Sequence, residues 1–324
     1  MRKKVVTIGG GTGQFTVLTG LKKYPELDIT AIVSMADDGG STGVLRDEYG
    51  VLPPGDLRQC LVALSRSSDA MRNLMNYRFD SGQLKGHNFG NLLITVFEKI
   101  SRDYNEAINV ISEILNIQGR VVPVTLDNVH LMCKLKDGRV IDGEHIIETA
   151  PVAKPGVSMM SLTESAKANP LALKAIREAD MIIVCPGNLY ASLIPNLLVH
   201  GIPEALRKSD AKKVFVCNLM NRKNQTDGYS VSDYVDELES YVTPEFFTHV
   251  IANTEIPPIE LIRKYKHEST PILAGRSKVP KFYKIVRGDF VSQKPVAIKK
   301  GDPIKRTLIR HDSNKLARQI VKLL

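Results

Sequence analysis

The sequence predicts an α/β fold in which a mostly parallel sheet is covered by helices on both faces. Runs rich in β-branched residues alternate with segments whose apolar residues recur at helical spacing, which is the pattern of such a sheet. Polar, Gly-rich loops follow several of the runs, at the sheet edge where open α/β folds bind ligands. The predicted strands are 4–8, 29–35, 181–185, 213–217 and 249–252.

The first strand is followed at residues 9–13 by Gly-Gly-Gly-Thr-Gly, and an apolar helix begins near Phe15. Glycines lack the Cβ atoms that would keep a ligand from the N–H groups of a helix N-terminus, so this corner is suited to phosphate. Its spacing matches neither the dinucleotide fingerprint G-x-G-x-x-G nor a Walker A loop. A tight turn in another kind of α/β domain is the alternative.

The second strand leads into an acidic loop, Ala-Asp-Asp-Gly-Gly-Ser-Thr-Gly at 36–43. Its adjacent carboxylates, Asp37 and Asp38, can bind a divalent cation or a ribose, although a solvated acidic turn is the alternative. Downstream, Pro-Pro-Gly-Asp-Leu-Arg at 53–58 presents Asp56 and Arg58. Asp56 either joins the two aspartates around Mg²⁺ or caps a helix, while Arg58 is suited to holding a phosphate.

Further loops place amide, imidazole and hydroxyl groups after predicted strands or before predicted helices. Such groups orient a sugar or a base through hydrogen bonds, and helix capping is the alternative for the asparagines. The ligand-binding candidates of the whole chain are Gly10, Gly11, Thr12, Gly13, Asp37, Asp38, Ser41, Thr42, Arg58, His87, Asn88, Asn91, Asn188, Asn218, Asp227, Tyr229 and Tyr265. The metal candidates are Asp37, Asp38 and Asp56.

Composition is that of a globular protein: 324 residues, 43% hydrophobic and 24% charged. No apolar run reaches the roughly 20 residues needed to cross a bilayer. The opening Met-Arg-Lys-Lys leads directly into a strand, unlike a signal peptide. The four cysteines contain no C-x-x-C pair, so we expect buried, reduced thiols and a cytoplasmic location.

The net charge of +9 comes entirely from residues 261–324, which hold 17 Lys and Arg against 4 Asp and Glu. Apolar residues recur within this basic segment, so we expect a folded element whose basic rim attracts an anionic ligand, and nucleic-acid binding is the weaker alternative.

Between residues 119 and 148 the pattern changes to short β-prone runs with a hairpin turn at 136–139. We expect an inserted antiparallel β element there, within a single domain spanning 1–324.

The ordered motifs at 9–13, 36–43, 53–58 and 86–91, with Thr-Asp-Gly-Tyr-Ser at 226–230, resemble the CofD-like family, and more narrowly its bacterial YvcK-type branch. The resemblance runs from Lys4 to about Asp312. It implies a Rossmann-like, three-layer α/β/α core that binds a nucleotide diphosphate ligand. The loops at 186–190 and 221–225 depart from the usual pattern of this branch, which leaves the fine ligand contacts there open.

Two activities follow from the resemblance. Phospholactate transferases of the family use Mg²⁺ and a guanylated donor to make a coenzyme F420 precursor. Resemblance to the YvcK-type branch implies instead a cytoplasmic protein that binds UDP-sugars, UDP-N-acetylglucosamine in particular. Such a protein is expected to be needed for growth and cell shape on gluconeogenic carbon sources. The loop at 39–43 and the absence of tryptophan favour the second activity, because a deazaflavin ring would have less to stack on.

Three functions therefore stay open: a UDP-sugar-binding regulator, a Mg²⁺-dependent transferase, and an NAD-binding protein. GDP is a further possible ligand. Neither a protein partner nor the oligomeric state follows from the sequence, and a homo-oligomer is possible.

Overall fold

The computed structural model describes residues 2–264, 268–276, 282–293 and 308–324. Its centre is a parallel sheet with seven strands among these residues. In spatial order the strands are β12 (Lys284–Gly288), β10 (His249–Asn253), β8 (Lys212–Val216), β7 (Met181–Val184), β1 (Lys3–Gly9), β2 (Leu27–Val33) and β3 (Arg120–Pro123).

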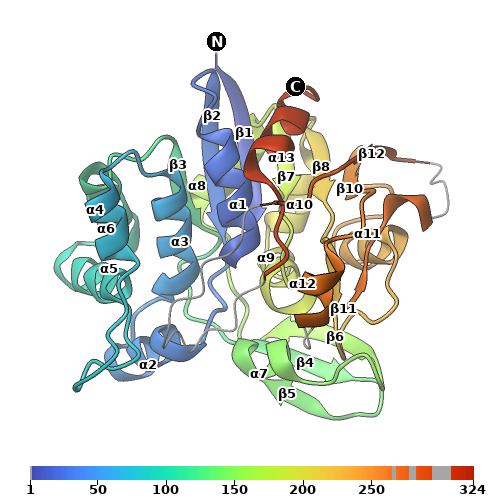
Figure 1. Cartoon of the computed structure of the whole chain (residues 1–324). Helices are drawn as coiled ribbons and strands as arrows, with labels where there is room; N and C mark the ends of the chain where they lie inside the picture. The colour runs from blue at the N-terminus through green and yellow to red at the C-terminus, as the bar shows by residue number, and fades with distance from the viewer. Residues whose placement is uncertain (1, 265–267, 277–281, 294–307) are drawn as a thin grey trace.

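Helices cover both faces of this sheet, so the three-layer, Rossmann-like prediction is confirmed (Figure 1). On one face α1 (Gly11–Leu21) packs against α3 (Pro54–Leu64) and α13 (Ser313–Val321), and on the other α8 (Pro170–Glu178) packs against α10 (Ile202–Lys208). The remaining helices are α2 (Gly40–Tyr49), α4 (Asp69–Met75), α5 (Phe89–Ile100), α6 (Tyr104–Ile114), the π-helix η1 (Leu189–Leu193), α9 (Ile194–Leu197), α11 (Val231–Glu239), α12 (Ile259–Lys264) and the 3₁₀ turn η2 (Ala274–Arg276).

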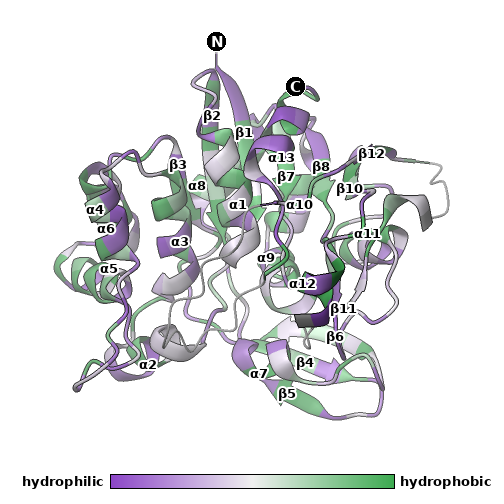
Figure 2. Cartoon of the chain, in the orientation of Figure 1, coloured by the Kyte–Doolittle hydropathy of each residue, from purple (hydrophilic) through white to green (hydrophobic). Residues whose placement is uncertain are grey.

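All five predicted strands belong to the parallel sheet. Strands buried on both faces are near-continuously apolar, and Val5, Val6 and Ile8 of β1 are each no more than 2% exposed. Figure 2 shows green along most of the central strands and purple where β1 and β8 begin with lysines, whereas the helices carry both colours.

The strand order reverses between β1 and β7. Each neighbours the other, yet β2 and β3 continue the sheet to one side of β1, while β8, β10 and β12 continue it beyond β7. Open α/β sheets bind ligands at the carboxyl edge of such a topological switch point. The loops after β1 and β7 therefore define the first place to look for a site.

The inserted antiparallel sheet exists, but its boundaries differ from the prediction. It consists of β5 (Val140–Asp142), β4 (Leu131–Leu135) and β6 (Val157–Leu162), with α7 (Glu144–Thr149) between β5 and β6. We call residues 131–162 the insert. The run at 120–123, predicted as part of it, is instead β3 and pairs in parallel with β2. Its buried valines are typical of a strand in the main sheet. The assignment to the inserted element was wrong because this run directly precedes the hairpin in the sequence.

The insert lies beyond the carboxyl ends of the central strands, at the opposite end of the molecule from both termini (Figure 1).

A further pair of strands, β9 (Met220–Arg222) and β11 (Glu268–Pro271), is antiparallel. All four cysteines are buried and unpaired, as predicted. Among the described residues, no helix combines the length and apolarity that a membrane span requires.

Close packing of α13 on α1 depends on Gly20. A Cβ atom built on Gly20 would lie 2.0 Å from the Ser313 carbonyl oxygen and 2.8 Å from Ala317 Cβ. The missing side chain thus lets the C-terminal helix approach the first helix, and the two termini lie near each other (Figure 1).

We predict that Gly20→Ala lowers the free energy of unfolding by about 1–3 kcal/mol, because the new methyl group forces the helices apart. Helix propensity alone would favour alanine by about 1 kcal/mol. Urea unfolding measures the change. Gly275→Ala is the control, since its Cβ would meet nothing within 4 Å. A Gly20→Ala protein as stable as the wild type would contradict the close packing.

Candidate functional site

The glycine corner lies at the switch point. Gly9 ends β1, Gly10 is the N-cap of α1, and Gly11 is the first helical residue, with a φ of +61° that glycine adopts without strain. A Cβ on Gly13 would lie only 1.8 Å from the Pro186 carbonyl oxygen. Gly13 therefore serves the contact between α1 and the loop after β7, while Gly10 and Gly11 form the helix N-terminus.

Two buried amides that the sequence analysis missed hold this corner in place. Gln14 Nε2 donates to the Ile32 carbonyl at 2.9 Å and to Thr7 Oγ1 at 3.1 Å, which ties α1 to β2 and β1. Asn196 Nδ2 donates to the Gly9 carbonyl at 3.3 Å. The available signal for Gln14 was that it is the one amide side chain within α1.

The Asp56 carboxyl group lies against the same glycines. It accepts a hydrogen bond from the Gly11 N–H, and a Cβ on Gly10 would lie 2.3 Å from Asp56 Oδ2. Asp56 belongs to the first turn of α3, whose N-cap is Pro53, so the helix-cap alternative does not hold. The carboxyl group instead meets the positive end of the α1 dipole, where a phosphate would also be attracted.

Asp37 approaches the same region from the loop after β2. Its Oδ1 accepts from the Gly39 N–H at 3.0 Å, and its carboxyl group also accepts from the Thr42 hydroxyl. A Cβ on Gly55 would lie 2.4 Å from Asp37 Oδ2, so this glycine admits Asp37 to the start of α3. We call Gly10, Gly11, Asp37 and Asp56 the switch-point site.

Burial of these carboxyl groups changes their acidity. Desolvation, and then the Asp37 charge, raises the pKa of Asp56 to about 8. Desolvation also raises the pKa of Asp37, against the opposing hydrogen bonds from Gly39 and Thr42. Two neighbouring carboxylates in a desolvated place favour protons or a cation.

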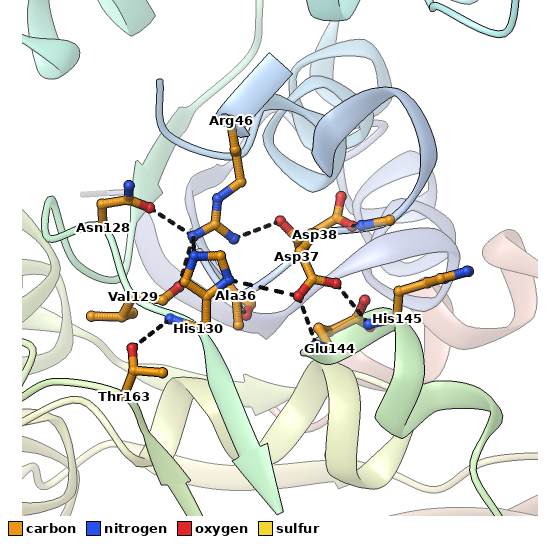
Figure 3. Close-up of polar contacts among 12 residues, drawn as sticks. Ala36, Asp37, Asp38, Arg46, Asn128, Val129, His130, Glu144, His145 and Thr163 are labelled. Carbon is orange, nitrogen blue, oxygen red and sulfur yellow. Dashed lines mark hydrogen bonds and ion pairs between the residues drawn. The ribbon is translucent and has the colours of Figure 1, made fainter. Parts of the chain in front are cut away.

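Asp38 does not join them. Its Oδ2 accepts from the Glu144 N–H at 2.9 Å and its Oδ1 from the His145 N–H at 2.8 Å, so both oxygens cap the N-terminus of α7 (Figure 3). His130 Nδ1 lies 3.8 Å from Asp38 Oδ2. Beside it, the Arg46 guanidinium donates to the carbonyls of Asp37, at 2.9 Å, and Val129, at 2.8 Å (Figure 3).

These contacts correct the predicted metal trio. In the described part of the chain, no three His, Cys, Asp or Glu side chains are arranged to hold one metal ion. Asp38 is turned away because it fastens the insert, which leaves Asp37 and Asp56. Carboxyl groups are the ligands that Mg²⁺ prefers, and proteins commonly hold the ion through one or two of them, with substrate phosphates and water completing the shell.

Other predicted residues gather to one side, around Ser41 of α2. Ser41 Oγ accepts from the Asn88 N–H at 3.2 Å and lies 3.3 Å from His87 Nδ1 and 3.4 Å from Asn91 Nδ2. Asn88 Oδ1 caps α5 through the Asn91 N–H. These loops meet at Ser41, and Asn88 plays the capping role of the alternative.

Arg58 contacts this cluster. Its Nε donates to Asn91 Oδ1 at 2.9 Å, and its Nη1 to Asn76 Oδ1 at 2.7 Å and the Met75 carbonyl at 3.3 Å. The side chain is buried. These protein acceptors explain its position, and they do not favour the predicted phosphate clamp.

On the other side of the switch point, amides join the loops after β7 and β8. Asn218 exchanges two hydrogen bonds with the Gly187 backbone, at 3.1 and 2.7 Å. Asn188 Oδ1 caps η1, and its Nδ2 donates at 3.0 Å to Gln225 Oε1. Gln225 is a buried residue that the sequence analysis missed.

The remaining candidates lie farther out or outside the described residues. Tyr229 shares a 3.1 Å hydrogen bond with the Tyr190 hydroxyl, while the exposed Asp227 accepts from the Asn224 N–H within its own turn. Thr12 is partly exposed in the first turn of α1. Tyr265 lies outside the described residues.

With this geometry established, comparison with known proteins is decisive. The family model of 2-phospho-L-lactate transferase CofD matches residues 5–285. The chain belongs to the CofD family. A protein of Thermotoga maritima is 42% identical over 322 residues, covering 99% of both chains. The gluconeogenesis factor of Bacillus subtilis is 38% identical over 327 residues, covering 100% of this chain and 98% of its own.

The fold of the CofD family member agrees with a solved relative. A crystal structure of a UPF0052-family protein from Bacillus halodurans superposes with a TM-score of 0.87 at 34% identity, covering 99% of each chain. The chain therefore shares its overall fold with this UPF0052-family protein, and its curated relatives include proteins named gluconeogenesis factors.

We predict that Asp38→Ala loosens α7, because it removes the acceptors of two backbone N–H groups. The loss of a helix cap costs about 1 kcal/mol, and amide hydrogen exchange at 144–149 should accelerate about fivefold or more. His145→Ala is the matched control, since it changes the side chain but keeps the capped N–H. Unchanged exchange in Asp38→Ala would contradict the capping role.

We also predict a pH dependence that comes from Asp56. Its pKa of about 8 in the fold exceeds the value of about 3.9 in an unfolded chain, so the native state binds more protons in between. The stabilisation is complete below about pH 4 and is lost as the pH rises through about 8. Relative to the wild type, Asp56→Asn should gain at least about 1 kcal/mol in free energy of unfolding between pH 4.5 and pH 8.

Urea unfolding in EDTA at both pH values tests this pH dependence. The exposed Asp47→Asn serves as the control and should show no such difference. A constant offset between Asp56→Asn and the wild type would rule out Asp56 as the source.

Proposed function

We propose that this protein binds a sugar nucleotide of the UDP-N-acetylglucosamine class at the switch-point site. The proposal rests on the position of the α1 N-terminus. It lies where the strand order reverses, and it is formed by Gly10 and Gly11, which have no side chains to block a ligand. Backbone N–H groups and the helix dipole at such a place attract a diphosphate.

Mg²⁺ completes this proposed site. Asp37 and Asp56 would hold the ion, and when bound it neutralises charge on the diphosphate oxygens. Without a cation, the two carboxyl groups would repel the phosphates that the helix N-terminus attracts. The amides of Asn188 and Asn218, in the loops after β7 and β8, are suited to the attached sugar or the base.

The proposed biological role is that of a cytoplasmic, non-catalytic regulator. It would be required for growth and normal cell shape on gluconeogenic carbon sources, with the sugar nucleotide as its signal. The names of the relatives from Bacillus subtilis and other bacteria support a role in gluconeogenic growth.

A Mg²⁺-dependent transferase is the second candidate. The carboxyl groups of Asp37 and Asp56 beside a phosphate-binding corner favour it, since phosphoryl-group chemistry uses such an arrangement. The matching family model is named 2-phospho-L-lactate transferase, which supports a transferase activity. NAD binding is the third candidate, and the incomplete dinucleotide fingerprint disfavours it.

Isothermal titration of the wild type with UDP-N-acetylglucosamine, GDP and NAD, with and without Mg²⁺, separates the three candidates. We expect UDP-N-acetylglucosamine to bind with a dissociation constant below about 100 µM, to bind more tightly with Mg²⁺, and to be recovered intact. Asp56→Asn should lose the Mg²⁺ effect, and Asp47→Asn should keep it. Cleavage of the ligand would favour the transferase, and the absence of binding would overturn the proposal.

A further inference from the structure

Helix α7 connects loops from the two halves of the main sheet. Its N-terminal N–H groups, those of Glu144 and His145, donate to Asp38 in the loop after β2. Its C-terminal carbonyls, those of Ile147 and Glu148, accept from Gln225 Nε2 at 2.6 and 2.9 Å. Asp38 lies in the loop after β2, and Gln225 lies in the connection from β8 to β10. β2 and β8 lie on opposite sides of the switch point, so this short helix ties the insert to both sides of the site.

Further contacts keep α7 beside the switch point. Arg222 Nη1 lies 3.1 Å from Glu148 Oε1, which adds an ion pair at the C-terminal end. The helix also packs against η1, the first element after β7. η1 in turn approaches the glycine corner, since a Cβ on Gly10 would lie 3.7 Å from Ser192 Cβ.

Glu144, the first residue of α7, has a side chain that makes no polar contact with the described residues. It is 9% exposed, and among the described residues its carboxyl group has no hydrogen bond or ion pair. Burial, and then the charges of Asp37, Glu148, Asp56 and Asp38, raise its pKa. The Glu144 N–H lies 2.9 Å from Asp38 Oδ2, one residue from Asp37, so Glu144 stands beside the switch-point site.

A largely buried carboxyl group without a protein partner is costly to the fold, and functional sites are where proteins retain such groups. Phosphate is a poor partner for it, because Asp37 and Asp56 already give this region negative charge. A hydroxyl group is a good partner, because a carboxyl group can accept its hydrogen bond and, when protonated, also donate one.

We propose that Glu144 recognises the bound sugar nucleotide by hydrogen bonding to its hydroxyl groups, so that the insert forms part of the binding site. This inference rests on the proposed function and goes beyond it by assigning ligand recognition to α7. The hydroxyl groups belong either to the ribose or to the attached sugar, and the experiment distinguishes them.

The test compares Glu144→Ala, Glu144→Gln and the control Ile146→Ala, an exposed position on the same helix. Dissociation constants for UDP and UDP-N-acetylglucosamine are measured by titration, with and without Mg²⁺, alongside melting temperatures. Glu144→Ala should weaken UDP-N-acetylglucosamine binding roughly tenfold. Glu144→Gln should stay within about threefold of the wild type, because its amide both donates and accepts, and Ile146→Ala should not change.

The ligands and the melting temperatures separate the possible causes. A loss for both ligands assigns the contact to the ribose, whereas a loss for UDP-N-acetylglucosamine alone assigns it to the attached sugar. Glu144→Ala should melt no lower than Ile146→Ala, since no protein partner is lost. A lower melting temperature, or a loss that appears only with Mg²⁺, would overturn hydroxyl recognition.

The proposed function and this inference fail in different ways. A wild-type protein that binds neither ligand overturns the proposed function, and this inference with it. A wild type that binds while Glu144→Ala binds equally well overturns this inference alone.

Discussion

The close contact between α1 and the loop after β7 is the constraint on which the site depends. Gly13 meets the Pro186 carbonyl where no side chain could fit, and this brings together two loops that lie more than 170 residues apart in the chain. The contact fixes the helix N-terminus at the point where the sheet reverses its order. Its glycines thus serve two purposes: Gly13 packs the fold, and Gly10 and Gly11 leave backbone donors accessible to Asp56 or to an anion.

The second constraint is negative charge in a desolvated region. Asp37 and Asp56 come from different elements, and Glu144 of the insert stands beside the switch-point site. In the fold, burial raises their pKa values, so protons relieve the repulsion. A bound ligand with Mg²⁺ and hydroxyl groups would replace those protons, which links the instability of the free site to its capacity to bind.

Local sequence patterns predicted the fold well because strands buried on both faces have an unmistakable composition. They failed at β3, whose valines are as β-prone as the neighbouring hairpin, because the choice between parallel and antiparallel pairing depends on distant partners. Ser41, His87 and Asn91 were predicted as ligand-binding candidates from their side chains, but their meeting depends on the packing of α2 beside α5, which local patterns do not give. Spacing alone could not foresee that Asp38 caps α7, since its partner lies 106 residues downstream.

Hydrogen exchange of the wild type, with and without UDP-N-acetylglucosamine and Mg²⁺, tests the central claim most directly, because it reports where a ligand acts. A ligand at the switch-point site should slow exchange at residues 10–13, which open α1, at 37–43, and at 144–149 of α7. Little change is expected at α13, which packs against the opposite, C-terminal end of α1 at Gly20. Binding without protection of the α1 N-terminus, or with protection confined to other elements, would contradict a site at the switch point.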